Sequence, residues 1–179
     1  MGMSCAIQAL TASKIEALYE DPRVTWDVFS APVDGEAETM FDEPLCKDLT
    51  LDKSWAMVRF LLLKAAGWSS HRDAIDPSTE LLYGDEVGDQ GDYYGPYLRD
   101  IENTRAFADF LRPLTLDKVM SHFDWQEMRK ESVYQVGRDQ ADEAEQRELR
   151  EYAGEYFRLL REYVLKAADS GCGLFLWVN

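Results

Sequence analysis

The sequence is poor in the residues that most often bind transition metals. It has two histidines and three cysteines among 179 residues, and Cys5, Cys46 and Cys172 stand far apart. Structural zinc sites need cysteines or histidines in closely spaced pairs, and a disulfide framework needs a clustered, even set. This usage indicates buried free thiols in a reducing compartment, with neither a zinc site nor disulfides.

Recognisable catalytic and cofactor motifs are also lacking. His71 lies near Asp73 and Asp76, but one histidine with flexible carboxylates is a weak metal pattern. The glycine-rich stretch 84–95 (GDEVGDQGDYYG) lacks the Lys-Ser/Thr ending of a phosphate loop and the acid spacing of a calcium loop. His122 is more typical of a structural histidine than of a catalytic one. We therefore predict no metal and no cofactor.

Positive charge is scarce. Lysine and arginine together number 19 against 34 acidic residues, which gives a formal net charge of −15. The excess lies in two segments: ten acids and two bases between Glu20 and Asp52, and nine acids and one base between Asp73 and Glu102. Such a field disfavours nucleic acids and anionic membranes, and it favours basic partners or cations. The alternative is that acidic loops only keep the protein dissolved.

Long apolar runs are missing as well. The densest one, Trp55–Ala66, has twelve residues, whereas a helix needs about 20 to span a bilayer. The first positive side chain is Lys14, so residues 1–20 lack the basic start of a secretory signal. We expect a cytoplasmic protein.

What the sequence does contain is one dense apolar stretch, Leu51–Ala66 (LDKSWAMVRFLLLKAA). Ten of its last twelve residues are apolar, so most faces of such a helix must contact protein. Asp52 suits the N-cap, with Thr50 as the competing choice, and Gly67 suits the helix end. We predict a central core helix over Asp52–Ala66.

Helix and strand patterns fill the rest of the chain. Capping residues with apolar stripes predict helices, and short apolar runs predict strands. The predicted fold is α+β: a mostly helical single domain, residues 1–179, with a small sheet that holds the N- and C-terminal strands side by side around the central apolar helix. The predicted strands are Ser4–Leu10, Leu81–Tyr83 and Leu174–Val178, and helices are expected to start at Thr11 or Ser13, Asp100, Thr115, Asp124 and Gln140.

The first turn of the central helix is the most specific candidate site. Lys53, Ser54 and the free N–H groups of a helix start would form a small anion pocket, with Trp55 next to them. Alternatively, Lys53 lies in solvent or pairs with a nearby acid. If the anion pocket forms, Lys53 would polarise an oxyanion there while a carboxylate from the glycine-rich region moves a proton. The candidate residues in that region are Tyr83, Asp85, Tyr94 and Tyr97.

Three classes of function are compatible with these patterns. The acidic charge and the aromatic residues favour a non-catalytic binding protein whose acidic surface neutralises a basic partner, such as a toxin. The alternative is a small-ligand-binding protein or an enzyme with a pocket at the N-terminus of the Asp52–Ala66 helix. No nucleophile with its base can be identified, which weighs against an enzyme. The third class is a structural module without a site.

Several segments of the sequence are similar to those of one known family. They are Met1-Gly2-Met3-Ser4, Leu51-Asp52-Lys53-Ser54-Trp55, Tyr94-Gly95-Pro96, Phe123-Asp124 with Met128, and the C-terminal helix with the last strand. On these residues the chain resembles the bacterial YfbM-like family, also called DUF1877, a domain of unknown function. Where family members tend to carry an aromatic-proline segment, this chain has Val133-Tyr134-Gln135-Val136-Gly137. The resemblance implies a compact α+β domain of the bacterial cytoplasm and no established activity.

Overall fold

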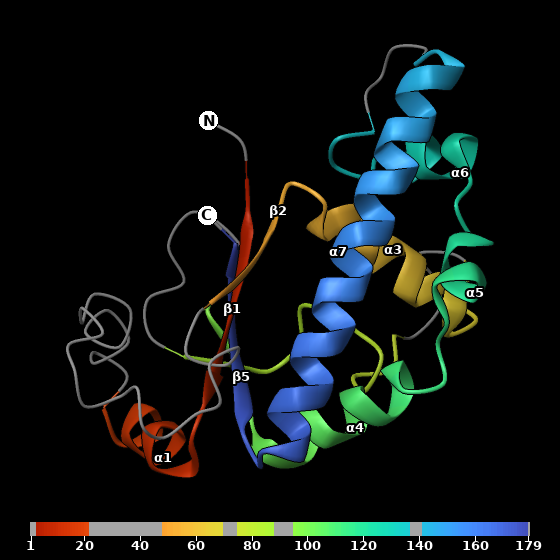
Figure 1. Ribbon diagram of the computed structural model, residues 1–179. Coiled ribbons are helices and arrows are strands. Elements are labelled where there is room, and N and C mark those ends of the chain that lie inside the picture. Colours follow the sequence, from red (N-terminus) through yellow and green to blue (C-terminus); the bar gives the residue numbers. More distant parts are fainter. Residues whose placement is uncertain (1–2, 22–47, 70–74, 88–94, 137–140, 179) are drawn as a thin grey trace.

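The computed structural model describes residues 3–21, 48–69, 75–87, 95–136 and 141–178. Its strands form one five-stranded sheet in the order β2-β1-β5-β4-β3, in which every neighbouring pair is antiparallel (Figure 1). The predicted α+β class is confirmed. The strands are β1 (Cys5–Leu10), β2 (Leu49–Asp52), β3 (Asp85–Glu86), β4 (Tyr97–Arg99) and β5 (Gly173–Val178).

The two terminal strands form the centre of this sheet. β1 pairs with β5 along its whole length, from Cys5 opposite Val178 to Leu10 opposite Gly173. β2 flanks β1 on one side, and β4 flanks β5 on the other. The prediction that the terminal strands lie side by side is therefore confirmed.

The outer strands were not visible in the sequence pattern. They are between two and four residues long, which is too short for an alternation of apolar and polar side chains to be recognised. The predicted strand Leu81–Tyr83 is wrong, because pairing with β4 begins only at Asp85.

Six helices lie in the described part of the chain, and side-chain caps begin most of them. Asp100, Thr115 and Asp124 each accept a hydrogen bond from the backbone N–H three residues further on, as expected. The first helix is capped by Thr11 and not by the competing Ser13. The helices are α1 (Ala12–Glu20), α3 (Trp55–Ala65), α4 (Ile101–Leu111), α5 (Leu116–Met120), α6 (Trp125–Lys130) and α7 (Glu143–Asp169).

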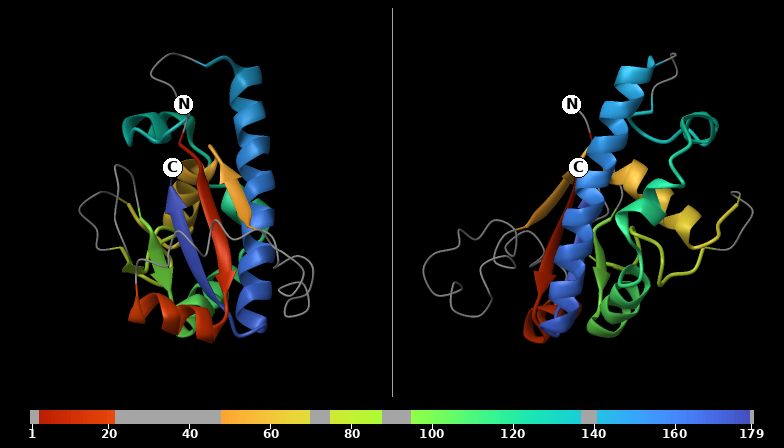
Figure 2. Two further views of the ribbon diagram at one scale, coloured as in Figure 1. Left: turned by 90° about the vertical axis from the view of Figure 1, so that its left-hand side faces the viewer. Right: turned by 45° about the vertical axis from the view of Figure 1, so that its right-hand side comes forward.

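Most helices pack on one face of the sheet. Cys5, Ile7 and Ala9 of β1 point into the large core with α3, α4 and α7, whereas Leu10 joins a smaller cluster with α1. The long helix α7 follows the sheet, and its first turns extend beyond the ends of the strands (Figure 2). Its 27 residues span about 40 Å at ~1.5 Å per residue.

Helix α3 is the predicted central apolar helix, and seven of its eleven residues are buried. Its predicted end is confirmed: Gly67 has φ +93°, and the N–H of Trp68 donates to the carbonyl of Leu63 at 2.9 Å. Its predicted start is wrong. The helix begins at Trp55, because Asp52 is the last residue of β2 and its φ of +44° is outside the helical region.

The predicted buried thiols are confirmed for Cys5 and Cys172. Burial raises the pKa of the Cys5 thiol to about 12, which keeps it protonated and unreactive. Cys46 and His71 lie outside the described residues. Among the helices of the described residues, none is long and apolar enough to cross a membrane.

Candidate functional site

Lys53 and Ser54 follow β2 directly and differ sharply in exposure. The Ser54 side chain is buried, and its hydroxyl donates to the carbonyl of Leu51 at 2.6 Å. The Lys53 side chain is exposed, and the described residues hold no ion pair for it. The Ser54 hydroxyl is therefore used within the turn before α3, and Lys53 is exposed beside it.

Asp52, the residue before this lysine, has a structural contact. The Tyr152 hydroxyl of α7 donates to Asp52 Oδ2 at 2.6 Å. Burial and then this hydrogen bond raise the pKa of Tyr152 above its usual range. The ring of Tyr156 lies edge-on against Tyr152, with centroids 4.9 Å apart. The segment before α3 thus joins the edge of the sheet to the long helix.

The other predicted site residues lie toward the opposite edge of the sheet. Asp85 is on β3 and Tyr97 on β4, whereas β2 leads to Lys53 at the far edge. Three strand steps of about 4.8 Å separate β2 from β4, or roughly 14 Å. Asp85 accepts a hydrogen bond from Tyr19 at 2.6 Å, and the Tyr83 ring lies beside the Arg99 guanidinium. The structure does not bring these residues together with Lys53, and Tyr94 lies outside the described residues.

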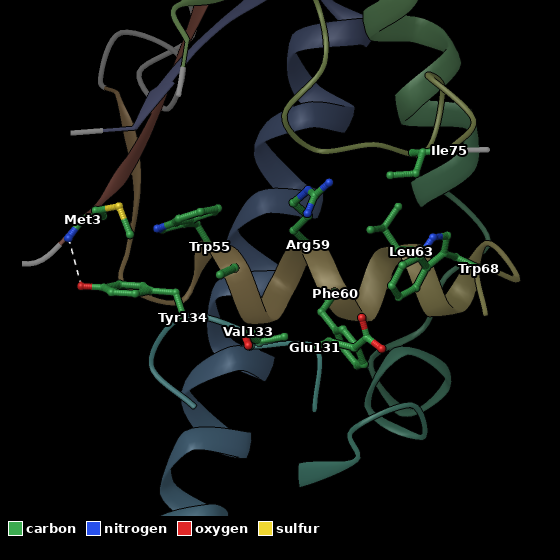
Figure 3. Close-up of a pocket in the computed structure, with 12 residues that line it drawn as sticks. Met3, Trp55, Arg59, Phe60, Leu63, Trp68, Ile75, Glu131, Val133 and Tyr134 are labelled. Atoms are coloured by element: carbon green, nitrogen blue, oxygen red, sulfur yellow. Dashed lines mark hydrogen bonds between the residues drawn. The ribbon is translucent and has the colours of Figure 1, made fainter. Parts of the chain in front are cut away.

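Trp55 is the predicted residue that lines a cavity. The cavity is a groove of about 420 Å³ along one flank of α3, and we call it the α3 groove (Figure 3). Its volume falls in the range of about 300–1,000 Å³ that is usual for ligand sites. Its lining residues are Met3, Trp55, Ala56, Arg59, Phe60, Leu63, Trp68, Ile75, Glu131, Ser132, Val133 and Tyr134.

Aromatic rings build most of the groove. Trp55 and Tyr134 stack with centroids 6.2 Å apart, and Phe60 meets Trp68 edge to face at 6.4 Å. Trp55 and Phe60 are buried and belong to the floor, whereas Tyr134 and Trp68 are half-buried and belong to the walls. The N–H of Met3 donates to the Tyr134 hydroxyl at 3.0 Å, which closes one end of the groove (Figure 3).

Two charged side chains are among the residues that line the groove. Arg59 projects from α3, and Glu131 projects from the wall that follows α6 (Figure 3). Arg59 is held by Glu80, because its Nε and Nη2 donate to the two carboxylate oxygens at 2.6 and 2.5 Å. The groove therefore presents an arginine whose charge is matched by Glu80, and Glu131 contributes carboxylate oxygens to its lining.

Two of these aromatic rings already contact the ammonium group of a lysine, Lys64. Lys64 Nζ lies 5.9 Å from the centroid of Phe60 and 5.8 Å from that of Trp68, and it pairs with Glu127 at 2.7 Å. An ammonium over an aromatic face is attracted by the ring quadrupole. The groove-lining rings thus already contact one cation inside the molecule.

The α3 side of the groove could be recognised from residue spacing in the sequence. Trp55, Arg59 and Leu63 are four residues apart, so they share one face of the helix, and Arg59 interrupts an otherwise apolar stretch. The opposite wall, Glu131–Tyr134, could not be assigned to this face, because nothing in the sequence links it to α3. It overlaps the stretch where the chain departs from the aromatic-proline segment expected above.

The family expectation is supported over nearly the whole chain. The family described as a domain of unknown function, DUF1877, matches residues 1–177. The chain belongs to the DUF1877 family. Its fold is similar to that of the crystal structure of YfbM from Escherichia coli, a protein of unknown function, with a TM-score of 0.62 and 15% identity over 97% of this chain and 98% of that chain. No match was found among curated proteins. Family membership confirms the predicted resemblance and assigns no activity.

Proposed function

We propose that this DUF1877 protein binds a basic protein partner and that its α3 groove takes a lysine or arginine side chain of that partner. The observation that carries this proposal is the composition of the groove: four aromatic rings, the carboxylate of Glu131, and an arginine already matched by Glu80. Such a lining offers ring faces and carboxylate oxygens to a long side chain that ends in a cation.

The charge of the whole chain supports the same kind of partner. A formal charge of −15 attracts basic proteins over a distance and speeds their association. The local and global charges therefore act in the same direction. The aromatic floor would add buried apolar area around the aliphatic part of the incoming side chain, which is how interface anchors gain most of their affinity.

The test uses short peptides and the NMR signals of the tryptophan indole N–H groups. A peptide with one central lysine is titrated against a peptide of the same length with norleucine, at low and moderate salt. We expect the lysine peptide to shift the Trp55 and Trp68 signals, and the norleucine peptide to shift them at much higher concentration. Equal affinities would contradict the proposal.

Two variants locate the binding. Glu131→Gln removes the wall carboxylate and should weaken lysine-peptide binding about tenfold, which corresponds to ~1.4 kcal/mol. Glu162→Gln makes the same charge change at an exposed position of α7, away from the groove, and should leave affinity within about twofold. If both variants weaken binding equally, the acidic charge acts without the groove.

The second candidate is a small cationic ligand or substrate in the same groove. The observation that favours it is that the groove begins at Trp55, the first residue of α3, and has the volume of a small-molecule site. Free tetramethylammonium and a single lysine amide distinguish the two. Binding of these compounds as tight as that of the peptide would favour the small ligand.

A further inference from the structure

Glu80 lies behind the α3 groove and is fixed from three directions. Its side chain is 8% exposed, and both carboxylate oxygens accept hydrogen bonds from Arg59. The N–H of Leu82 donates to Glu80 Oε1 at 3.0 Å. The backbone carbonyl of Glu80 accepts a hydrogen bond from Arg99 Nη2 at 2.5 Å. The carboxylate therefore has little freedom to leave Arg59.

The anchor on the carbonyl side is itself immobile. Arg99 is fully buried, and its guanidinium lies 4.4 Å from the centroid of Phe107 and 5.5 Å from that of Tyr83. A guanidinium packed between two rings and tied to a carbonyl holds that stretch of backbone in one place. Arg99 thus positions Glu80 from the side of the sheet.

The groove-facing arginine depends on this arrangement. Arg59 is 35% exposed, so without Glu80 its fork of N–H groups would be a ready site for a carboxylate or a phosphate. With Glu80 in place, two of its nitrogens are occupied and its charge is matched.

We propose that Glu80 sets the charge preference of the α3 groove: it cancels the charge of Arg59, so that the groove takes cations, and its removal converts the groove into an anion site. Glu80 is a positioning residue, because it acts through Arg59 and does not line the groove. This inference rests on the proposed function of the same groove, yet it makes a separate claim about anions.

The experiment compares the wild type, Glu80→Gln and the double variant Arg59→Met/Glu80→Gln. Each is titrated with the lysine peptide and with a peptide of the same length that carries glutamate instead. Glutamine keeps the shape of the side chain and the acceptor for Leu82, so the change is mainly one of charge. Thermal unfolding establishes that each variant is folded, and Glu162→Gln serves as the control with the same change in net charge.

We expect Glu80→Gln to weaken lysine-peptide binding about tenfold and to gain binding of the glutamate peptide. The double variant should lose that gain, and the control should resemble the wild type. The inference would be overturned if Glu80→Gln bound both peptides as the wild type does. It would also be overturned if the double variant, which lacks Arg59, still bound the glutamate peptide. If Glu80→Gln does not fold, Arg59→Met tests the inference instead. This variant leaves the charge of Glu80 unmatched behind the groove, so it must strengthen lysine-peptide binding.

The two proposals fail in different ways. If the wild type binds no lysine peptide at the groove, the proposed function fails, while a gain of glutamate-peptide binding in Glu80→Gln still supports the role of Glu80. If the wild type binds the lysine peptide and Glu80→Gln behaves identically, the role of Glu80 fails alone.

Discussion

Two arginines contact Glu80 from different regions of the molecule, and their surroundings differ. Arg59 reaches its carboxylate from the groove side with 35% of its side chain exposed, whereas Arg99 reaches its carbonyl from the sheet side and is fully buried. Burial lowers the pKa of Arg99 to about 10, against the opposing effect of Glu80. The comparison teaches that the groove side keeps contact with solvent, whereas the sheet side is fixed by close packing.

The largest expected effect is on the sheet side. Arg99→Ala removes the side chain between Phe107 and Tyr83 and takes the donor from the carbonyl of Glu80, so we expect a loss of about 3–5 kcal/mol in the free energy of unfolding. Arg59→Ala should cost less, about 1–3 kcal/mol, because it leaves the buried Glu80 carboxylate without its cation but opens that site to solvent. Urea unfolding measures both, and equal losses would break the comparison. Arg99→Met should recover part of the loss, because it refills the space without a buried charge.

A backbone contact next to Arg99 gives the second test. A Cβ on Gly173 would lie 2.6 Å from the carbonyl oxygen of Arg99 and 2.6 Å from Ile15, so Gly173→Ala must push strands apart. We expect a loss of about 2–3 kcal/mol. Gly171→Ala is the matched control: its φ is +69° but no atom lies within 4 Å, so only backbone strain of about 1 kcal/mol should appear. A ranking in the reverse order would show that the β4–β5 pair can relax around Gly173.

Tyr152→Phe tests the contact that joins the sheet edge to α7. Loss of the hydrogen bond to Asp52 should cost about 1–2 kcal/mol at neutral pH. The folded-state pKa of Tyr152 is raised above its ordinary value of 10, so the contribution is complete below pH 10 and is lost as pH rises toward the folded-state pKa. Stability curves of both proteins should therefore converge above about pH 10. A constant difference across that range would contradict the assignment.

The smallest effect is expected beside the groove. Lys64 and Glu127 form a partly exposed ion pair, with side chains 16% and 32% exposed. Glu127→Gln should change the free energy of unfolding by about 0.5 kcal/mol, and added salt should reduce that difference further. A loss as large as that of Gly173→Ala would show that the groove side is also rigidly packed.

The sequence predicted those helices and strands whose signals lie within a few neighbouring residues. The caps Asp100, Thr115 and Asp124 and the two terminal strands were found because capping and apolar runs act over a few residues. The start of the central helix was misplaced because an aspartate that suits a cap also suits the end of a strand. Here the pairing of β2 with β1 outweighed the local preference.

The candidate site could be predicted only in part, for a similar reason. Trp55 was found because it stands at the start of the apolar helix. The shared partner of Arg59 and Arg99, Glu80, could not be predicted from the sequence, because both contacts join separate elements of the fold. Arg99 is the single base between Asp73 and Glu102, and charge counting placed it among solvated acids, whereas the chain buries it completely. Part of that acidic excess also has internal contacts: Glu80 pairs with Arg59, and Asp85 binds Tyr19.

The pairing of β1 with β5 has a consequence for the order of synthesis. The two central strands come from opposite ends of the described chain, so β1 leaves the ribosome long before its main partner exists. At about 5–20 residues per second, the wait lasts roughly 10–30 s. During this time the apolar side chains of β1 and its edge toward β5 stay uncovered, which makes the nascent chain a substrate for chaperones.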